Sequence, residues 1–266
     1  MEGLSAYASL GEVALLAGLA STRVAVAFVL LPLFAPDTVP ALVRGALFLS
    51  LALLSVALQP VLHLERLNTA MWIALYGKEA FIGLALGFSL AAFLWAFEAA
   101  GAIVDTKVAA ANGQINDPLS GQPVTPTGAL LGRLASFLFM AGGGFLLFVG
   151  LLLDSFRLWP VGRLVLAPQL AAVGLFEQHF ADLMVLALLI AAPALVVMFA
   201  VDLALGLVNR YAPQLNLISV SMSLKGVAAT AIWMLILAQL VQAFGEELAR
   251  RLAAVIPALQ RVFPGG

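Results

Sequence analysis

The stretch that decides the fold is Phe180–Val208, FADLMVLALLIAAPALVVMFAVDLALGLV. About 20 consecutive apolar residues are enough for a helix to cross the hydrocarbon core of a bilayer, and this run exceeds that length. Five more apolar runs accompany it: Leu10–Phe34, Ala41–Leu62, Met71–Val104, Leu134–Leu153 and Val220–Phe244. A charged segment, Glu246–Val262, follows, and we expect an amphipathic C-terminal tail over residues 244–266. The pattern predicts an all-α, polytopic helical membrane protein with a single membrane domain over residues 1–266.

The composition supports a membrane protein and argues against several other classes. Hydrophobic residues make up 63% of the chain and charged residues 10%, whereas soluble domains average about 45–50% and about 25%. Too few polar residues are present to cover a soluble core, so lipid or neighbouring subunits must cover much of the exterior. The net charge of −1 argues against nucleic-acid binding, and the absence of cysteine excludes disulfides and thiolate metal sites. The first residues lack the basic segment of a cleavable signal peptide, so we expect the first apolar run to be retained.

Several charged or polar residues lie within the apolar runs or directly after them. They are Arg23, Glu79, Glu98, Asp202, Asn209, Arg210 and Lys225. Charges at membrane depth are costly and usually face a partner, a bundle interior or water. Lys225 and Arg210 lie near run ends, where the alternative is a side chain that extends to the membrane interface. Arg23 and Asp202 are flanked by long apolar stretches, so for them we favour a buried ion pair or a subunit contact. Asn209 follows Asp202 by seven residues and lies on the same helical face.

Two further features indicate more than a plain bundle of spans. Gly83 and Gly87 form a GxxxG pattern that permits close helix packing, although a glycine-rich chain also produces this spacing by chance. Pro213 is expected to break the helix between the last two runs. After it, polar residues fall at 214, 216, 219, 221, 223 and 225, a period near two that is typical of a half-buried strand. Such a segment must line a cavity or lie within protein, since lipid cannot satisfy its backbone; the alternative is a simple polar turn.

Signals for enzyme chemistry are nearly absent. His63 and His179 have no second His, Asp or Glu at metal-ligand spacing, and no GxSxG, HExxH or P-loop motif occurs. We therefore expect no catalytic residues, no metal and no cofactor. A Ser–His intramembrane protease stays open in principle, because any serine could approach a histidine in space. A proton- or ion-coupled transporter with Glu79, Glu98 and Asp202 as a relay is a stronger alternative. In the competing interpretation these acids pair with Arg23 or with partner subunits.

Several segments, in this order and spacing, resemble one family. They are Arg44 downstream of Pro32 and Pro40, KEAFIGLALGF at 78–88, GAIVD at 101–105, NDPLSG at 116–121, LFMAGGG at 138–144, SFRLWP at 155–160, and Asp202 with NRYAPQLN at 209–216 and Lys225. Together they resemble the T subunit family of the type III secretion export apparatus, called SctT in injectisomes and FliR in flagella. The resemblance covers about residues 20 to 245. SFRLWP is more similar to the injectisome branch than to the flagellar branch.

The resemblance implies a non-enzymatic structural and gating subunit in the bacterial inner membrane. Family members join R-type and S-type subunits in a helical export gate, through which unfolded secreted proteins pass, with the large export-gate subunit and the switch protein nearby. They are built of kinked helical hairpins, so the six apolar runs would pack on sister subunits as well as on lipid. The alternative is a stand-alone secondary transporter with Asp202 and Glu98 in a proton or substrate site.

The turn-rich loop from Asp105 to Thr127 has a special place in this resemblance. It corresponds by position to the family loop that helps to close the pore. The residues that it offers for pore closure or gating are Asp105, Asn112, Gln114, Asn116 and Asp117. Polar residues suit a seal that opens for many different chains. An ordinary surface loop is the alternative, because such loops are also rich in Asn, Asp, Gly and Pro.

Overall fold

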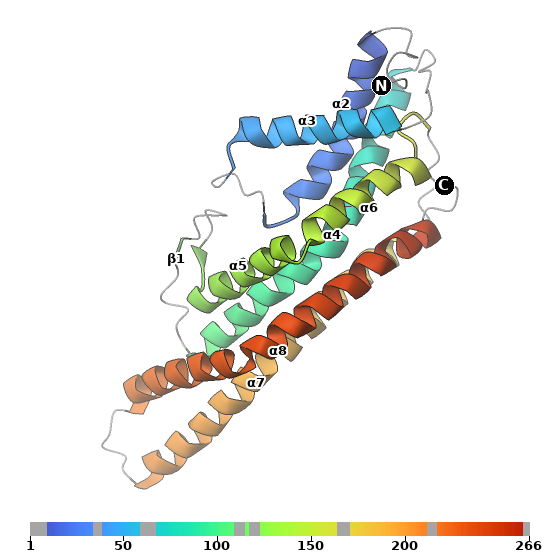
Figure 1. Cartoon of the computed structure of the whole chain (residues 1–266). Helices are drawn as coiled ribbons and strands as arrows, with labels where there is room; N and C mark the ends of the chain where they lie inside the picture. The colour runs from blue at the N-terminus through green and yellow to red at the C-terminus, as the bar shows by residue number, and fades with distance from the viewer. Residues whose placement is uncertain are drawn as a thin grey trace. The chain divides into compact units, whose positions relative to one another are not determined.

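A computed structural model describes residues 10–33, 39–58, 68–108, 115–116, 123–163, 171–211 and 217–262. These residues form long helices and one very small antiparallel pair of strands (Figure 1). The helices are α2 (Leu10–Val29), α3 (Ala41–Leu58), α4 (Thr69–Val108), α5 (Pro126–Ala141), α6 (Gly144–Leu158), α7 (Ala171–Tyr211) and α8 (Leu217–Val262). The strands β1 (Ile115–Asn116) and β2 (Pro123–Val124) have two residues each. The predicted all-α class is confirmed.

The fourth apolar run, Leu134–Leu153, was predicted as one helix but forms parts of two helices. The chain ends α5 at Ala141 and begins α6 at Gly144. Gly143 lies between them with φ of 75°, in the left-handed region that a residue without Cβ adopts at little cost. The three consecutive glycines therefore divide the run, which hydrophobicity alone could not reveal.

The strand-like pattern after Pro213 is a second difference. Residues from Leu217 onward are helical, and α8 continues without interruption through the predicted tail to Val262. A helix satisfies its own backbone hydrogen bonds in an apolar environment, whereas a lone strand leaves them open. Residues 212–216, and with them Pro213, lie outside the described residues, but α7 ends at Tyr211 and α8 begins at Leu217, on either side of the predicted break.

Not all of the six apolar runs form helices long enough to span a membrane. Within the described residues, α4, α7 and α8 are long and apolar enough to cross a membrane, and the interrupted pair of α5 and α6 adds a fourth span if it counts as one. The apolar helices α2 and α3 are shorter. Of the six apolar runs, three or four thus correspond to helices of full spanning length within the described residues.

The chain divides into two compact units, and α4, α7 and α8 each continue from one into the other. Unit 1 comprises residues 1–91, 143–179 and 249–266, and unit 2 comprises residues 92–142 and 180–248. The prediction of a single domain over residues 1–266 stays a prediction.

Unit 1 is built on a close contact between α2 and α4. A Cβ added at Gly83 would lie 2.5 Å from the carbonyl oxygen of Arg23, and one at Gly87 would lie 2.5 Å from that of Ala27. The GxxxG spacing thus brings two backbones together, as it does in membrane helix pairs. Beside this contact, Phe28 of α2 is fully buried and packs edge-on against Phe148 of α6, with 5.2 Å between ring centroids. Both contacts fix the position at which the charged side chains of unit 1 meet.

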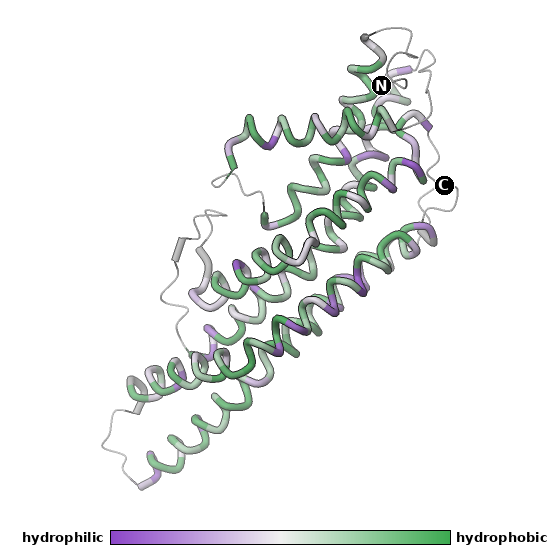
Figure 2. Tube along the Cα trace, viewed as in Figure 1, coloured by the Kyte–Doolittle hydropathy of each residue, from purple (hydrophilic) through white to green (hydrophobic). Residues whose placement is uncertain are grey.

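Unit 2 has a small, tightly packed interior and large exposed apolar faces. Phe244 of α8 packs on Phe93 and Phe97 of α4, at centroid distances of 4.9 and 5.3 Å. A Cβ at Gly101 of α4 would lie 2.6 Å from backbone atoms of Gly128 in α5, so these helices touch through glycine. Figure 2 shows the hydrophobic residues that cover α7 and much of α8. Many of these side chains have no cover within the described chain.

Candidate functional site

Arg23 lies at the centre of a fully buried polar cluster in unit 1. Its Nε donates to Glu79 Oε2 at 2.7 Å, and both side chains are 0% exposed. One terminal nitrogen donates to Ser155 Oγ at 3.0 Å, and the other donates to the carbonyl oxygen of Trp159 at 2.8 Å. The guanidinium also lies 4.0 Å from the ring centroid of Phe156. A buried charge needs partners of this kind to offset its lost hydration, and here the chain itself supplies them.

Glu79 also has a second cationic partner. Lys78 Nζ lies 2.8 Å from Glu79 Oε1, and the Lys78 side chain is 3% exposed. Arg23 and Glu79 were predicted from the sequence to be buried charges or subunit contacts, whereas Lys78, Ser155 and Trp159 were not. Trp159 contributes a backbone carbonyl, which carries no sequence signal. The adjacent pair Lys78-Glu79 was a visible signal for a second cation.

The three acids of the predicted relay do not gather in one compact unit. Glu79 belongs to unit 1, whereas Glu98 and Asp202 belong to unit 2. The side chain of Glu98 lies against α5, where a Cβ added at Gly132 would be 3.6 Å from Glu98 Oε2. Glu79 lies within ion-pair distance of two cations, Arg23 at 2.7 Å and Lys78 at 2.8 Å. These contacts favour ion pairing over the relay.

Asp105, near the end of α4, caps the N-terminus of α5. Its Oδ2 accepts hydrogen bonds from the backbone nitrogens of Thr127 at 2.7 Å and Gly128 at 3.3 Å, and its Oδ1 accepts from Thr127 Oγ1 at 2.5 Å. The local N-cap residue, Thr125, makes no capping bond of its own. A carboxylate from another helix therefore satisfies amides that a helix start leaves open. Asp105 joins the two ends of the predicted pore loop.

Most of that loop is outside the part of the chain that the structure describes. Asn112, Gln114 and Asp117 fall there. Asn116 is described in its backbone, where it lies opposite Pro123 in the β1–β2 pair. A role for these four residues in the pore stays a prediction.

Asp202 and Lys225 form an ion pair between α7 and α8. Lys225 Nζ lies 2.5 Å from Asp202 Oδ1, and the side chains are 14% and 39% exposed, respectively. Lys225 is thus directed at a carboxylate instead of extending to a membrane interface. The carboxylate remains open on one side, in contrast to the enclosed cluster around Arg23.

The face of α7 beyond Asp202 is open. Asn209 and Arg210 are exposed in its last turns. Gly206, one turn after Asp202, is also exposed, and an added Cβ would meet nothing within 4 Å. This part of the α7 surface therefore has no neighbour within the described chain.

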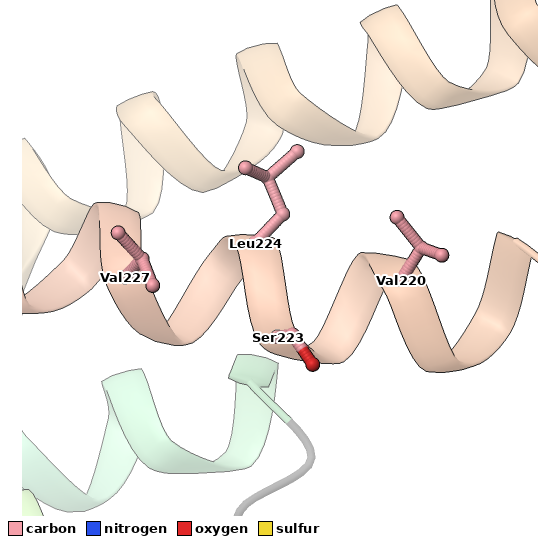
Figure 3. Close-up of a pocket in the computed structure, with 4 residues that line it drawn as sticks. All are labelled: Val220, Ser223, Leu224 and Val227. Carbon is pink, nitrogen blue, oxygen red and sulfur yellow. The ribbon is translucent and has the colours of Figure 1, made fainter.

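A shallow groove lies along the start of α8. It has a volume of about 470 Å³ and is lined by Val220, Ser223, Leu224 and Val227 (Figure 3). Its lining is apolar except for the Ser223 hydroxyl. Lys225 lies between two of the lining residues in the sequence, so the groove and the ion pair belong to the same two turns of α8. Sequence analysis missed the groove because it interpreted these residues as a strand or a turn.

The structure brings one serine to one histidine, in an orientation that opposes a serine nucleophile. Ser89 Oγ lies 3.0 Å from His179 Nε2 and donates its proton to the carbonyl oxygen of Ala85 at 2.6 Å. His179 must then donate to the hydroxyl, whereas a catalytic base accepts from it. The contact pins α7 to α4 within unit 1.

Comparison with known proteins identifies the family. Residues 14–250 match the model of the family described as bacterial export proteins, family 1. The chain belongs to this family.

Relatives of this export protein carry names from both secretion and flagellar systems. The chain is 33% identical over 207 residues to Yop proteins translocation protein T of Yersinia pestis, an alignment that covers 76% of this chain and 78% of that protein. It is 30% identical over 201 residues to secretion system apparatus protein SsaT of Salmonella typhimurium, covering 74% and 77%. It is 29% identical over 194 residues to flagellar biosynthetic protein FliR of Escherichia coli, covering 71% and 72%.

These matches confirm the resemblance to the T subunit family of type III export. The long apolar helices and the family together establish a multi-pass inner-membrane protein. The protein is a subunit of a secretion export apparatus, and other export subunits are its partners.

Proposed function

We propose that this chain is a structural and gating subunit of the core export gate of a type III secretion system. In this role it joins R-type and S-type subunits, with the large export-gate subunit and the switch protein nearby. Unfolded secreted proteins cross the inner membrane through the assembled gate. The chain contributes packing surfaces and a pore loop, and it catalyses no reaction.

The observation that carries the proposal is an ion pair set in an exposed apolar face. On α7, Val196, Phe199, Leu203 and Leu207 are 67%, 63%, 56% and 62% exposed, and half-exposed Asp202 lies at the edge of this face, one turn after Phe199. A charged side chain at the centre of a lipid-facing helix costs about 2.5–3.5 kcal/mol on insertion scales. Lys225 offsets part of this cost, and protein cover that donates a hydrogen bond to the open side of Asp202 would offset more of it. The apolar face with its carboxylate therefore fits a neighbouring subunit better than lipid.

The groove on α8 extends the same contact surface. Gly206 and Ser223 leave room for close approach, and small residues with hydroxyl groups are typical of helix–helix contacts inside membranes. Val220, Leu224 and Val227 add exposed apolar surface on the same two turns as Lys225. We therefore propose that a helix of an R-type or S-type subunit packs over Asp202, Lys225 and the groove, and that Asn209 and Arg210 extend this contact.

The cap formed by Asp105 supports the gating part of the proposal. It holds the start of α5 against the end of α4, so the loop between Val108 and Pro123 leaves and re-enters the body at fixed points. We propose that the polar residues of this loop, Asn112, Gln114, Asn116 and Asp117, seal the pore between export events. Fixed ends with polar residues between them suit a seal that must yield to many different chains.

We also propose the injectisome branch over the flagellar branch. The SFRLWP segment supports it, as does the 33% identity to a Yop translocation protein against 29% to a flagellar protein. Deleting the gene should stop secretion of effector-type proteins and leave swimming motility unchanged. Loss of motility with normal effector secretion would assign the chain to the flagellum instead.

The decisive experiment is mild detergent extraction followed by identification of co-purifying proteins. We expect the full-length chain to co-purify with R-type and S-type subunits, and Asp202→Asn to reduce that recovery while the chain itself still accumulates. Asp154→Asn is the matched control, because Asp154 is 58% exposed and pairs only with Arg157 on the surface of α6 among the contacts described. A stable isolated monomer that transports a small solute would overturn the proposal and favour a secondary transporter.

A further inference from the structure

The turn that follows α6 directs its backbone carbonyls at a buried ammonium group. Lys78 Nζ donates hydrogen bonds to the carbonyl oxygens of Pro160 at 2.7 Å, Val161 at 3.0 Å and Arg163 at 3.0 Å. Glu79 Oε1 lies 2.8 Å from the same nitrogen. Four protein oxygens thus stand where water would surround an exposed lysine, so the ammonium is coordinated by the chain itself.

Other contacts also hold this turn: Arg23 donates to the carbonyl oxygen of Trp159 at 2.8 Å, and Trp159 and Val161 are 2% and 0% exposed. The described backbone bonds of the turn are Trp159 N to Ser155 O at 2.9 Å and a longer one, Arg163 N to Pro160 O, at 3.3 Å. Pro160 has no N–H to donate. Carbonyl dipoles that converge on one point repel one another unless a cation lies there. The ammonium of Lys78 is therefore the group that makes the convergence of these three carbonyls favourable.

Charge balance separates Lys78 from the neighbouring ion pair. Arg23 and Glu79 already form a one-to-one pair at 2.7 Å, so Glu79 does not need Lys78 for neutralisation. The additional positive charge lies beside the C-terminal end of α6, where the aligned peptide dipoles favour a cation. The position and partners of Lys78 thus match the turn better than they match the carboxylate.

We propose that Lys78 is a positioning residue that fixes the turn after α6, and that export depends on this turn. The chain passes from the turn through residues 164–170 into α7, which begins in unit 1 and carries Asp202 further along. A turn held at one geometry sets where α7 starts. The statement about export rests on the proposed function, whereas the statement about the turn does not.

The rate of trypsin cleavage after Arg163 measures how often the turn opens. The Arg163 side chain is exposed, but the carbonyl of the bond that trypsin would cut after it is held by Lys78. A serine protease must bind that carbonyl oxygen in its own oxyanion hole, so cleavage requires release from the ammonium. The cleavage rate after Arg163 in detergent-extracted, tagged full-length protein therefore reports how often the turn opens. Cleavage after Arg157, which is exposed on α6, is the internal reference.

Lys78→Met is the test variant, because it removes the ammonium, keeps the length of the side chain and leaves Arg23 and Glu79 as a neutral pair. We expect cleavage after Arg163 to accelerate at least about tenfold relative to cleavage after Arg157. Lys107→Met is the matched control, since Lys107 is exposed near the end of the same helix, and it should cleave like the wild type. Unchanged cleavage in Lys78→Met would overturn the proposal.

Lys78→Arg keeps the charge but replaces a compact three-donor group by a planar fork that does not fit three converging carbonyls. We expect it to accumulate and still to expose the bond after Arg163. Wild-type cleavage in Lys78→Arg would show that charge alone suffices and would overturn the positioning role. Failure of both variants to accumulate would also overturn it, because Lys78 would then support the whole of unit 1 and not the turn.

A secretion assay tests the dependence of export on the turn. In cells that carry Lys78→Met in place of the wild-type gene, we expect protein secretion to fall at least about tenfold, in line with the opening of the turn, while the surface control Asp154→Asn secretes normally. A strain that lacks the gene distinguishes failure of the proposed function from failure of the proposed role of Lys78. If that strain secretes normally, the proposed function fails. If it does not secrete but Lys78→Met does, the present inference fails alone.

Discussion

Replacing Asp105 with alanine removes the carboxylate that caps α5, and the consequence is local and measurable. Asp105 is 3% exposed and accepts three hydrogen bonds from Thr127 and Gly128. Truncation leaves both amides at the helix start without this acceptor. The local N-cap residue, Thr125, makes no capping bond that replaces it.

The magnitude follows from the count of bonds and their shared origin. A hydrogen bond to a charged group contributes about 1.5–3 kcal/mol, and loss of an N-cap side chain costs about 0.5–2 kcal/mol. The three bonds share one carboxylate and are not additive, so we expect about 3 kcal/mol for Asp105→Ala, or about 100-fold in the opening equilibrium. Asp105→Asn keeps one acceptor oxygen and loses the charge at the helix start, so we expect about 1.5 kcal/mol, or about tenfold.

Hydrogen exchange read by mass spectrometry measures this opening in the peptide that covers the first turns of α5. We expect protection to fall in the order wild type, Asp105→Asn, Asp105→Ala, with peptides of α2 unchanged. Thr106→Ala is the matched control, because the Thr106 hydroxyl only donates to a carbonyl within its own helix among the described contacts. Protection in Asp105→Ala within about threefold of the wild type would correspond to less than about 1 kcal/mol and would refute the cap.

Three other substitutions, with Gly150→Ala as a control, test the packing inside each of the two units. Glu79→Gln leaves two buried cations without their carboxylate, and because breaking a buried ion pair costs about 3–5 kcal/mol we expect the protein to disappear from membrane immunoblots. Gly101→Ala would place a Cβ 2.6 Å from the backbone of Gly128 and should lower the thermal midpoint, since overpacking costs about 1–3 kcal/mol. Gly150→Ala, whose Cβ would meet nothing within 4 Å, should leave that midpoint unchanged or raise it. Phe244→Ala should cost about 3–5 kcal/mol through the lost aromatic contacts, as seen in a lower denaturant midpoint, and a normal midpoint would contradict the described core of unit 2.

The sequence predicted the long helices because their signal is local. Apolar runs such as Phe180–Val208 exceed the thickness of a bilayer, and α7 contains that run whole. The division of Leu134–Leu153 was missed because a hydropathy profile averages over the glycines that make the turn. The start of α8 was misinterpreted because the spacing of polar residues carries no information about the surroundings of the segment. In an apolar environment a helix satisfies its own backbone hydrogen bonds, whatever the spacing of its polar side chains.

The charged residues were predictable as a set but not as partners. Arg23 and Asp202 were selected because each interrupts an apolar run, and both form ion pairs. Their partners lie 56 and 23 positions away, and only the packing of α2 on α4 and of α7 on α8 determines which acid meets which base. The carbonyls of Trp159, Pro160 and Val161 were beyond prediction, because every residue has a carbonyl.

The two ion pairs differ in how completely the chain surrounds them, and this difference separates folding from assembly. The pair in unit 1 is 0% exposed on both sides and is completed by Ser155 and backbone carbonyls, so nothing outside the chain is needed to offset its desolvation. The pair in unit 2 leaves the Asp202 carboxylate 39% exposed beside apolar side chains, so its free oxygen must accept hydrogen bonds from groups outside the chain. Neutralising the first pair should therefore remove the protein, whereas neutralising the second should leave the protein and remove its partners. If neutralising either pair only lowered the amount of protein in the membrane, the second pair would also be needed for folding. The assembly surface would then have to lie elsewhere on α7 or α8.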